Sequence, residues 1–475
     1  MASQSRSLKA GINRYRRYLV REERLYLPAA ELEPDISDIQ GKTAIYVLGP
    51  VLNAFVVWVL QNAVKSGKQR LYFLARDGYL MYRAARIYTE RFSIPIECRY
   101  LCCSRYSLRI PMFHMDLKDA MEYICRDSIG VNLTRILNRA GLTAPEQESV
   151  LEDIGERGQG EVPVPYARLE KIKEKLWHSE IFLEAVIRHS REAVPALTGY
   201  LTQEGLMEET KAALVDSGWV GSMQKTLNQV LRNMGRRSVL EGYYWGLYEL
   251  PPNIKRESYH CYYFSPERQL RAKVGFNNNL FETIFSAPHG MTLEYEEKDG
   301  RYEPVFAHIS SERRNEMESL EKMLSRYVQH AAGKLGDLNE ADCERQKKVL
   351  QKLMTLFMSR PSPEEAESFG RMIFCDDVLE YGNRQIAVHM SESDLRDNHV
   401  ISKILVMLGI GKKDIKESAW YEGSAVRYSR HPAWHLFQYG IYKYLLNIRQ
   451  MWMWRRRNER EKKQQELRQK EKNRQ

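Results

Sequence analysis

Hydrophobic and polar positions between residues 50 and 104 follow two alternating periods. Residues 50–65 and 78–91 place apolar side chains at helical spacing, whereas residues 71–75 and 96–103 are short apolar runs typical of buried strands. A strand, a crossover helix and a second strand of these lengths form a βαβ unit, in which the two strands are parallel.

The same alternation returns later in the chain. Helical patterns at about 181–204 and 221–234 enclose an apolar run at 211–215, and another strand pattern follows at 238–245. Strands that alternate with helices of this length predict a doubly wound, mostly parallel, Rossmann-like α/β sheet. Shorter strands are predicted at 259–264 and 292–296, while residues 281–285 fit either a strand or a helix.

Two helical regions interrupt and follow this core. Charged helical patterns broken by Gly and Pro fill the stretch between the two halves, and further helical patterns begin near residue 308. We therefore expect a polar N-terminal segment (1–40), the first half of the α/β core (41–104), a helical insertion or cap (105–180), the second half of the core with short strands (181–307), a helical C-terminal region (308–432) and a basic C-terminal helix (433–475).

Residues 44–64 are uncharged throughout, which is close to the length that a membrane-spanning helix needs. The segment contains Gly49-Pro50, Asn53 and Gln61-Asn62, and its periodic part is only about fourteen residues long. A buried helix that packs on the sheet fits this pattern better than a membrane span.

Composition excludes some classes of function. The net charge is +10, but residues 455–475 hold ten Lys/Arg and four Glu, so most of the excess belongs to this tail. The body therefore lacks the basic surface that wraps nucleic acid, and we expect no nucleic-acid partner. Seven scattered cysteines form no C-x-x-C pair, which argues against a zinc site and, without a secretory signal, predicts a cytoplasmic protein.

Two strand ends carry the candidate chemistry. Residues 216–224 (Asp-Ser-Gly-Trp-Val-Gly-Ser-Met-Gln) follow an apolar strand and open into a helix, and Arg76-Asp77-Gly78 forms an earlier corner of the same kind. Ligands bind at the carboxyl ends of strands in such sheets, and helix N-termini attract anions. We expect one ligand cleft between the corners, with Asp77 and Asp216 as the catalytic residues. The Asp216 carboxylate would bind Mg²⁺, a sugar hydroxyl or a proton.

The remaining candidate residues would bind the substrate. The glycines would let the backbone approach a phosphate, the serines and arginines would bind it, and Trp219 would stack on a sugar or base. Glu282 and His289 would add acid–base groups from a later loop. The candidates are Arg76, Gly78, Ser104, Arg105, Ser217, Gly218, Trp219, Gly221, Ser222, Gln224, Glu282 and His289.

The same residues also fit a purely structural interpretation. Asp216 would then cap the following helix, the glycines would serve turn geometry, and Trp219 would pack in the core.

Near the C-terminus, residues 452–457 (Trp-Met-Trp-Arg-Arg-Arg) suit the surface of an anionic bilayer, which predicts peripheral contact with the inner face of the membrane. A solvated helix end whose tryptophans pack back on the body is the alternative.

These motifs resemble a family of predicted HAD-superfamily-type hydrolases encoded in bacterial capsule and cell-surface polysaccharide gene clusters. The resemblance covers about residues 45–425 and rests on Gly49-Pro50 and residues 73–80, 104–105, 216–224, 287–290 and 420–424. It implies an enzyme that acts on a phosphorylated or nucleotide-linked sugar, beside a glycosyltransferase partner.

The chain departs from the HAD phosphatase pattern at one position. Residues 73–78 (Phe-Leu-Ala-Arg-Asp-Gly) place Ala75 where that pattern has its nucleophilic aspartate, and alanine cannot form an aspartyl-phosphate. A noncatalytic scaffold that recruits a glycosyltransferase is therefore the alternative function. The order of the corners is also similar to type I phosphoribosyltransferases, although Ser217 stands where those enzymes have a second acidic residue.

Overall fold

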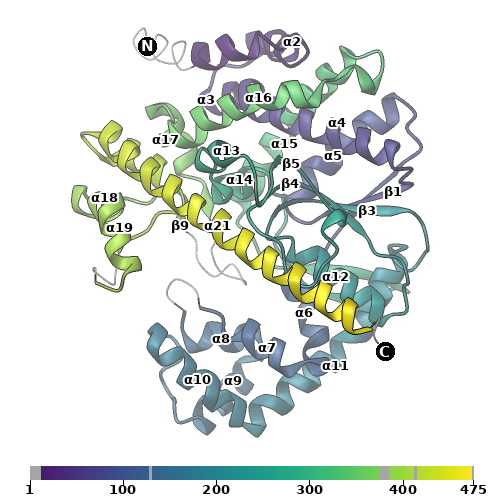
Figure 1. The fold of residues 1–475 in the computed structure, drawn as a ribbon, viewed down its shortest axis with the longest axis vertical. Coiled ribbons are helices and arrows are strands. Elements are labelled where there is room, and N and C mark those ends of the chain that lie inside the picture. The colour runs from purple at the N-terminus through teal and green to yellow at the C-terminus, as the bar shows by residue number, and fades with distance from the viewer. Residues whose placement is uncertain (1–11, 128–130, 375–383, 411–414, 473–475) are drawn as a thin grey trace.

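The computed structural model describes residues 12–127, 131–374, 384–410 and 415–472. Its centre is a five-stranded parallel sheet in the order β2-β1-β3-β4-β5 (Figure 1). The strands are β1 (Arg70–Leu74), β2 (Glu97–Leu101), β3 (Ala212–Trp219), β4 (Glu241–Leu247) and β5 (Tyr259–Phe264). The predicted parallel, Rossmann-like α/β core is confirmed.

The order of the strands reverses between β1 and β3. The chain first goes from β1 outward to β2, then returns to the other side of β1 and continues outward through β4 and β5. In open α/β sheets the crevice at such a reversal is where ligands bind. The two glycine-containing corners follow these two neighbouring strands, so the topology brings them to the same edge.

Helices cover both faces of the sheet. Side chains alternate along each strand, so the apolar strands present hydrophobic side chains on both faces, and both need to be buried. On one face, Leu71 and Phe73 of β1 pack in a core that is covered by α4 (Gly49–Lys65) and α5 (Gly78–Arg91). Two later helices, α15 (Ser311–Gly333) and α16 (Cys343–Met354), belong to the same hydrophobic cluster. Tyr72 and Leu74 point to the opposite face, which is covered by α11 (Glu180–Gln203) and α12 (Ser222–Asn233).

The apolar segment before β1 is a core helix, as the sequence predicts. It runs without a break through α3 (Ile39–Thr43), the π-helical turn η2 (Ala44–Leu48) and α4. This 27-residue helix is long and apolar enough to cross a membrane, but 94% of its most apolar window is buried inside the protein. Gly49 leaves room for the ring of Tyr327, since a Cβ there would lie 2.5 Å from that ring.

Residues 105–127 and 131–186 form a helical lobe beside the sheet (Figure 1). Its helices are α6 (Arg105–Arg109), η3 (Ile110–Met115), α7 (Leu117–Ile124), α8 (Leu133–Arg139), α9 (Ala144–Asp153) and α10 (Tyr166–His178). The lobe has a hydrophobic cluster of its own, which includes Ile136, Leu137 and Phe182. The start of α11 belongs to this cluster, whereas its end covers the sheet, so α11 joins the two units.

The chain after β5 begins with short elements. Residues 281–285, which fitted strand or helix by sequence, lie largely in a helix, α14 (Asn278–Ile284). An antiparallel hairpin of β6 (Thr292–Lys298) and β7 (Arg301–Phe306) follows outside the main sheet. The other short elements are η4 (Arg256–Ser258), α13 (Leu270–Val274), η5 (Leu338–Glu340), η6 (Thr355–Ser359), β8 (Ile373–Phe374) and β9 (Arg384–Gln385).

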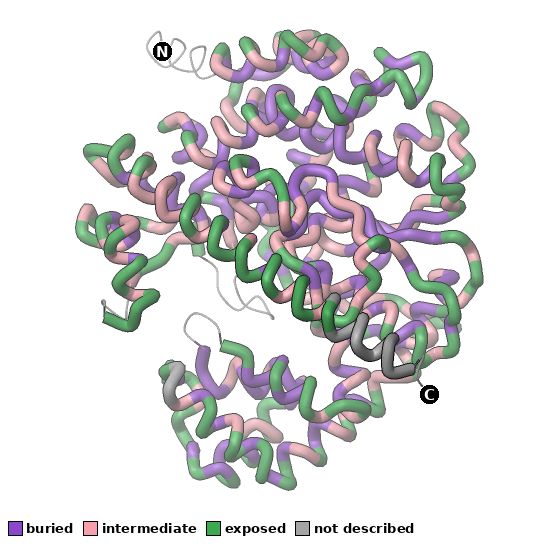
Figure 2. Tube along the Cα trace, viewed as in Figure 1, coloured by how far each residue is buried: buried purple, intermediate pink, exposed green. Residues whose placement is uncertain are grey.

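Helices dominate both ends of the chain. Residues 12–19 are helical and are followed by α2 (Glu23–Leu32) and η1 (Glu33–Asp35), which close one end of the core. The C-terminal helices are α17 (Pro363–Gly370), α18 (Glu392–Asp397), α19 (Val400–Met407), α20 (Tyr421–Tyr428) and α21 (Pro432–Lys472). The last of these runs across the outside of the molecule as a single helix (Figures 1 and 2).

Candidate functional site

The carboxyl edge of the sheet is stepped at the point where the strand order reverses. β1 pairs with β3 only as far as Phe73 and Val215, whereas β3 continues beside β4 as far as Trp219. The predicted strand end at residue 215 is therefore four residues too early. The extension carries Asp216 and Ser217 past the last residues of β3 that pair with β1, so β1 forms no strand pairing with these two residues.

A serine links the two corners at this step. The Ser217 hydroxyl donates a hydrogen bond to Asp77 Oδ2, and the Ser217 backbone N–H donates to Asp216 Oδ1 at 2.9 Å. Asp77 precedes the first residue of α5 and Asp216 lies on β3, 139 positions later in the sequence. The structure thus brings together the two carboxyl groups that the sequence proposed as one centre.

A third carboxyl group joins them from α14. Glu282 accepts a hydrogen bond from the indole N–H of Trp219 at the end of β3. Asp77, Asp216 and Glu282 are all half-buried, and their charges influence one another. Glu282 therefore belongs with the two aspartates.

These carboxyl groups hold protons more strongly than ordinary acids. Burial, followed by the charge of Asp77, raises the pKa of Asp216 to about 8 and that of Glu282 to about 7. Burial also raises the pKa of Asp77, although the Ser217 hydrogen bond and the two nearby arginines act against it. Carboxyl groups that titrate near neutral pH are suited to donating and accepting protons in catalysis.

Positive charge lies next to the acidic group. Arg76 and Arg105 both act to lower the pKa of Asp77 and of Glu282, and Arg105 is exposed to solvent. The N-termini of α5 and α12 lie at the same edge, and α12 begins at Ser222 with no side-chain cap. Helix N-termini carry partial positive charge, so this edge combines proton donors with groups that attract an anion.

His289 lies on the β2 side of the edge. Its Nδ1 is 2.8 Å from the carbonyl oxygen of Gly290, which can only accept, so Nδ1 carries the proton in this contact. Nε2 lies 2.8 Å from the Tyr100 hydroxyl, and in the Nδ1–H tautomer it accepts the hydroxyl proton. Tyr79 of α5 contacts both rings, with centroid separations of 5.4 Å to Tyr100 and 6.4 Å to His289.

The sequence analysis did not find Tyr79 or Tyr100. Tyr100 interacts with the charges of both Arg76 and Asp77, which places it between the first corner and His289. The only sequence feature that could have indicated a role for Tyr100 in the site was its position near the end of the second predicted strand. Nothing in the sequence pairs it with His289.

The glycines of the second corner serve the packing of the protein, and their role in admitting a ligand stays a prediction. Gly218 has φ +114°, and a Cβ there would lie 2.5 Å from the carbonyl oxygen of Gly246. At Gly221, with φ +67°, a Cβ would lie 2.8 Å from the ring of Tyr259. Gly78 of the first corner similarly packs against the backbone of Phe73, where a Cβ would be 3.0 Å away.

Two predicted substrate-binding residues have structural roles in the protein. Ser104 is buried and caps α6, where it accepts from the Ser107 N–H and donates to the carbonyl oxygen of Thr292. Gln224 is fully buried on the inner side of α12. Its amide group donates to the carbonyl oxygens of Leu240 and Ser258 and accepts from Tyr244. The helical period turns Gln224 inward, away from the carboxyl edge.

Trp219 is partly packed into the core, so its predicted stacking on a sugar is not supported by its surroundings. Its ring centroid lies 5.3 Å from that of Phe276 and 5.7 Å from that of Phe281. Tyr248 and Phe264 also contact it, at 6.2 and 6.4 Å. The role that the structure gives to Trp219 is to position Glu282 through the indole N–H.

The described residues hold no group of three His, Cys, Asp or Glu side chains arranged to bind a metal ion. Mg²⁺ often takes only one or two protein carboxylates and completes its shell with water and substrate phosphates. The oxygen ligands of Asp77 and Asp216 suit that mode, so a Mg²⁺ ion that arrives with its substrate fits the residues present.

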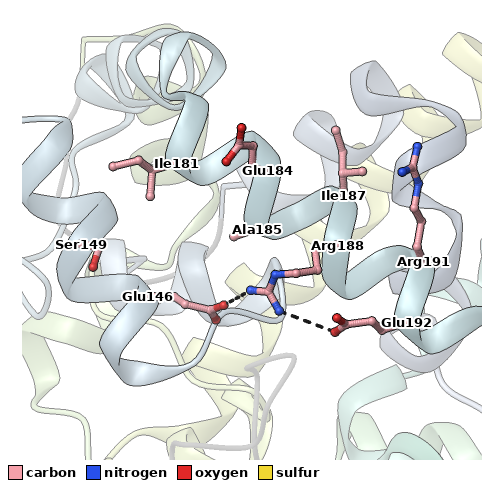
Figure 3. Close-up of a pocket in the computed structure, with 9 residues that line it drawn as sticks. All are labelled: Glu146, Ser149, Ile181, Glu184, Ala185, Ile187, Arg188, Arg191 and Glu192. Carbon is pink, nitrogen blue, oxygen red and sulfur yellow. Dashed lines mark hydrogen bonds and ion pairs between the residues drawn. The ribbon is translucent and has the colours of Figure 1, made fainter.

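A separate surface hollow lies on the helical lobe, between α9 and α11 (Figure 3). It is bordered by Arg188, which bridges Glu146 and Glu192, and by Ile181 and Glu184. The arginine there is already paired with acidic residues. None of the residues predicted from the sequence as site residues lines this hollow.

Comparison of the chain with models of known protein families and with curated proteins gives no match. The interpretation of the site therefore rests on its geometry and on the sequence motifs.

Proposed function

We propose that the protein is an enzyme that acts on a phosphorylated or nucleotide-linked sugar, with Asp77, Asp216 and Glu282 as its acid–base centre. The observation that carries the proposal is the hydrogen bond from Ser217 to Asp77 beside Asp216. It joins both corners at the reversal of strand order, where an open α/β sheet binds its ligand.

The carboxyl groups would supply proton transfer. With pKa values near 8 and 7, Asp216 is mostly protonated at neutral pH and Glu282 is divided between its two forms. A protonated Asp216 would donate to the oxygen of the leaving group, and an ionised Glu282 or Asp77 would accept a proton from the incoming hydroxyl. Transfer to water or to a second substrate would use the same groups.

The basic groups would bind the phosphate. Arg76 and Arg105 lie within electrostatic reach of the carboxyl groups, and the uncapped N-terminus of α12 adds backbone N–H donors. A phosphate held there would place its ester oxygen toward the carboxyl groups. In a reaction that uses Mg²⁺, Asp77 and Asp216 would instead hold the ion in their ionised forms, where it would neutralise phosphate charge, and Glu282 would remain for proton transfer.

Ala75 sets a limit on the reaction. It is the first residue after β1, where its N–H donates to the carbonyl oxygen of Leu101 at 3.0 Å, and it offers no nucleophile. The proposed chemistry therefore proceeds without an aspartyl-phosphate on this residue. The resemblance to the polysaccharide-cluster family supports a role in cell-surface polysaccharide assembly.

A phosphoribosyltransferase-like reaction is the second candidate. The adjacency of the corners on β1 and β3 favours this reaction. In such enzymes a glycine-containing corner and an acidic strand end would form one substrate site, so the two corners must lie next to each other. Ser217 occupies the position of their second acid, and here it bonds to Asp77 from the other corner.

Thermal stabilisation by a ligand panel tests both candidates. The purified protein would be heated with nucleotide sugars, sugar phosphates and phosphoribosyl pyrophosphate, each with and without Mg²⁺. A ligand at a hundred times its dissociation constant adds about 2.7 kcal/mol of stability. We expect at least one compound to stabilise the wild type and to lose its effect in Asp216→Asn.

Glu148→Gln is the matched control, because Glu148 is an exposed acid on the helical lobe. Stabilisation by phosphoribosyl pyrophosphate alone would select the second candidate. No stabilisation of a well-folded protein by any compound would contradict the proposal and would favour the noncatalytic scaffold.

A further inference from the structure

The outer face of α21 carries an apolar stripe that no part of the described chain covers. Trp434, Phe437, Leu445, Ile448 and Trp452 are all exposed, with exposed fractions between 40% and 58%. Their spacing of three, four or a multiple of these places them on one side of the helix, together with the partly exposed Ile441. The stripe runs from Trp434 to Trp452, nineteen residues, or about 27 Å of helix.

The opposite face of α21 holds the helix to the body, so the stripe has a fixed orientation. Lys443 pairs with the buried Glu422 at 2.9 Å and donates to the carbonyl oxygen of Phe276. Trp454 is buried against Tyr244 and Leu247 at the end of β4. The stripe is therefore exposed on a helix that is packed in place. Figure 2 shows exposed and intermediate segments alternating along α21, which runs across the outside of the molecule.

A second apolar element flanks the stripe. α19 packs beside α21, with His399 bonded to His435 at 2.8 Å and Arg449 reaching the sulfur of Met407 at 3.9 Å. In and just after α19 six aliphatic side chains are exposed, two of them by 70% or more. They are Ile401, Ile404, Leu405, Met407, Leu408 and Ile410. These side chains and the stripe are two groups of exposed apolar residues on neighbouring helices, which together we call the α19–α21 surface.

Positive charge borders this surface at its C-terminal end. Within residues 449–463, the exposed side chains that the structure describes include five cations and one acid, Glu459. The cations are Arg449, Arg455, Arg456, Arg460 and Lys463. Arg456 also lies over the ring of Trp452 at 3.6 Å, where the apolar stripe meets the basic end.

We propose that the α19–α21 surface docks the protein on an anionic lipid bilayer. Aromatic and aliphatic side chains beside arginines match a bilayer boundary, where the rings enter the acyl region and the cations meet acidic headgroups. The charge complementarity selects this occupant over a second copy of the chain, whose stripe would bring the same excess of cations. The proposal is independent of the proposed reaction.

Sedimentation of the full-length protein with lipid vesicles tests the docking. Vesicles of phosphatidylcholine alone and of phosphatidylcholine mixed with phosphatidylglycerol would be compared at low and high salt. We expect binding only to the mixed vesicles, weakened by salt because the headgroup contacts are screened. Binding of equal strength to both vesicles, or to neither, would overturn the proposal.

Two variants separate the contributions of the apolar and basic groups. Phe437→Ser/Ile448→Ser/Trp452→Ser is expected to weaken binding by more than about tenfold, because three exposed apolar groups that would enter the bilayer are lost. Arg455→Gln/Arg456→Gln, which alters only exposed positions and leaves the apolar stripe intact, should weaken it by about fivefold for each arginine.

Val162→Ser/Trp177→Ser/Ile181→Ser is the matched control, because these three apolar residues are equally exposed on the helical lobe. It should bind the mixed vesicles as the wild type does. Unchanged binding of the folded stripe variant would overturn the proposal. So would a wild-type dimer, measured by light scattering, that this variant converts to monomer.

Discussion

At the scale of single residues, the site is defined by carboxyl groups whose affinity for protons has been raised. Asp216 lies half-buried beside Asp77 and within reach of Glu282, and burial is the main reason that its pKa rises. Ser217 relieves part of the repulsion by donating to both aspartates. An arrangement that keeps acidic side chains close at a cost in stability is typical of functional sites.

This cost gives a pH-dependent prediction for Asp216→Asn. The pKa of Asp216 is about 8 in the folded protein against an ordinary value of 3.8, so from pH 5 to pH 8 the folded state binds more protons than the unfolded state. Wild-type stability therefore falls as pH rises, by up to about 1.4 kcal/mol per pH unit for this group. Asp216→Asn has no carboxyl group at this position, so this contribution to the fall in stability is absent from the variant.

Urea unfolding at pH 5, 6.5 and 8 measures the effect. Relative to the wild type, Asp216→Asn should gain stability steadily with increasing pH, whereas Glu148→Gln should show no such trend. Parallel pH profiles for the wild type and Asp216→Asn would mean that Asp216 is an ordinary ionised carboxylate.

At the scale of elements, β3 decides the shape of the site because it extends beyond β1. The extension pairs with β4, and Gly218 lies opposite Gly246 in that pairing. The two glycines allow the strands to approach closely at a backbone conformation with φ +114° at Gly218. A side chain at position 218 would force β3 away from β4 and would displace both Asp216 and Trp219.

Gly218→Ala should accordingly destabilise the protein by about 3 kcal/mol or more, because it adds a backbone clash to an unfavourable φ. Gly235→Ala is the control, since Gly235 also has a positive φ, +99°, but open space where a Cβ would lie. That change should cost only about 1 kcal/mol. Equal losses of unfolding free energy in denaturant titrations would show that the close approach is unimportant.

Sequence patterns predicted the elements better than their ends. The alternation of periods located all five strands of the sheet and the helices between them, because burial on one face or on both leaves a strong signal. The extension of β3 through Ser217, Gly218 and Trp219 was missed, since these residue types are typical of turns. These residues form a strand only because they pair with β4, which lies later in the sequence.

The candidate site was predicted in part. Asp77, Asp216, Ser217 and Glu282 come together as expected, because each follows from topology or from a nearby motif. The roles of Gly218, Gly221, Ser104 and Gln224 depend on tertiary neighbours such as Gly246 and Tyr259, which no local pattern reveals.

At the scale of the whole molecule, α21 connects the sheet to the outer surface. Trp454 packs on Tyr244 and Leu247, and the same two side chains lie beside Gly218 of the candidate site. The α19–α21 surface is thus carried on a helix that rests on the strand next to the site. Docking on a bilayer would hold the site in a fixed orientation to that bilayer.

The central claim is that two corners from distant parts of the chain form one ligand site. The most direct test is to measure by calorimetric titration the dissociation constant of a stabilising sugar phosphate or nucleotide sugar for the wild type, Asp77→Asn, Asp216→Asn and Glu148→Gln. Both aspartate variants should bind at least about tenfold more weakly, a loss of about 1.4 kcal/mol, while the control binds normally. Unchanged affinity in either aspartate variant would contradict a single shared site.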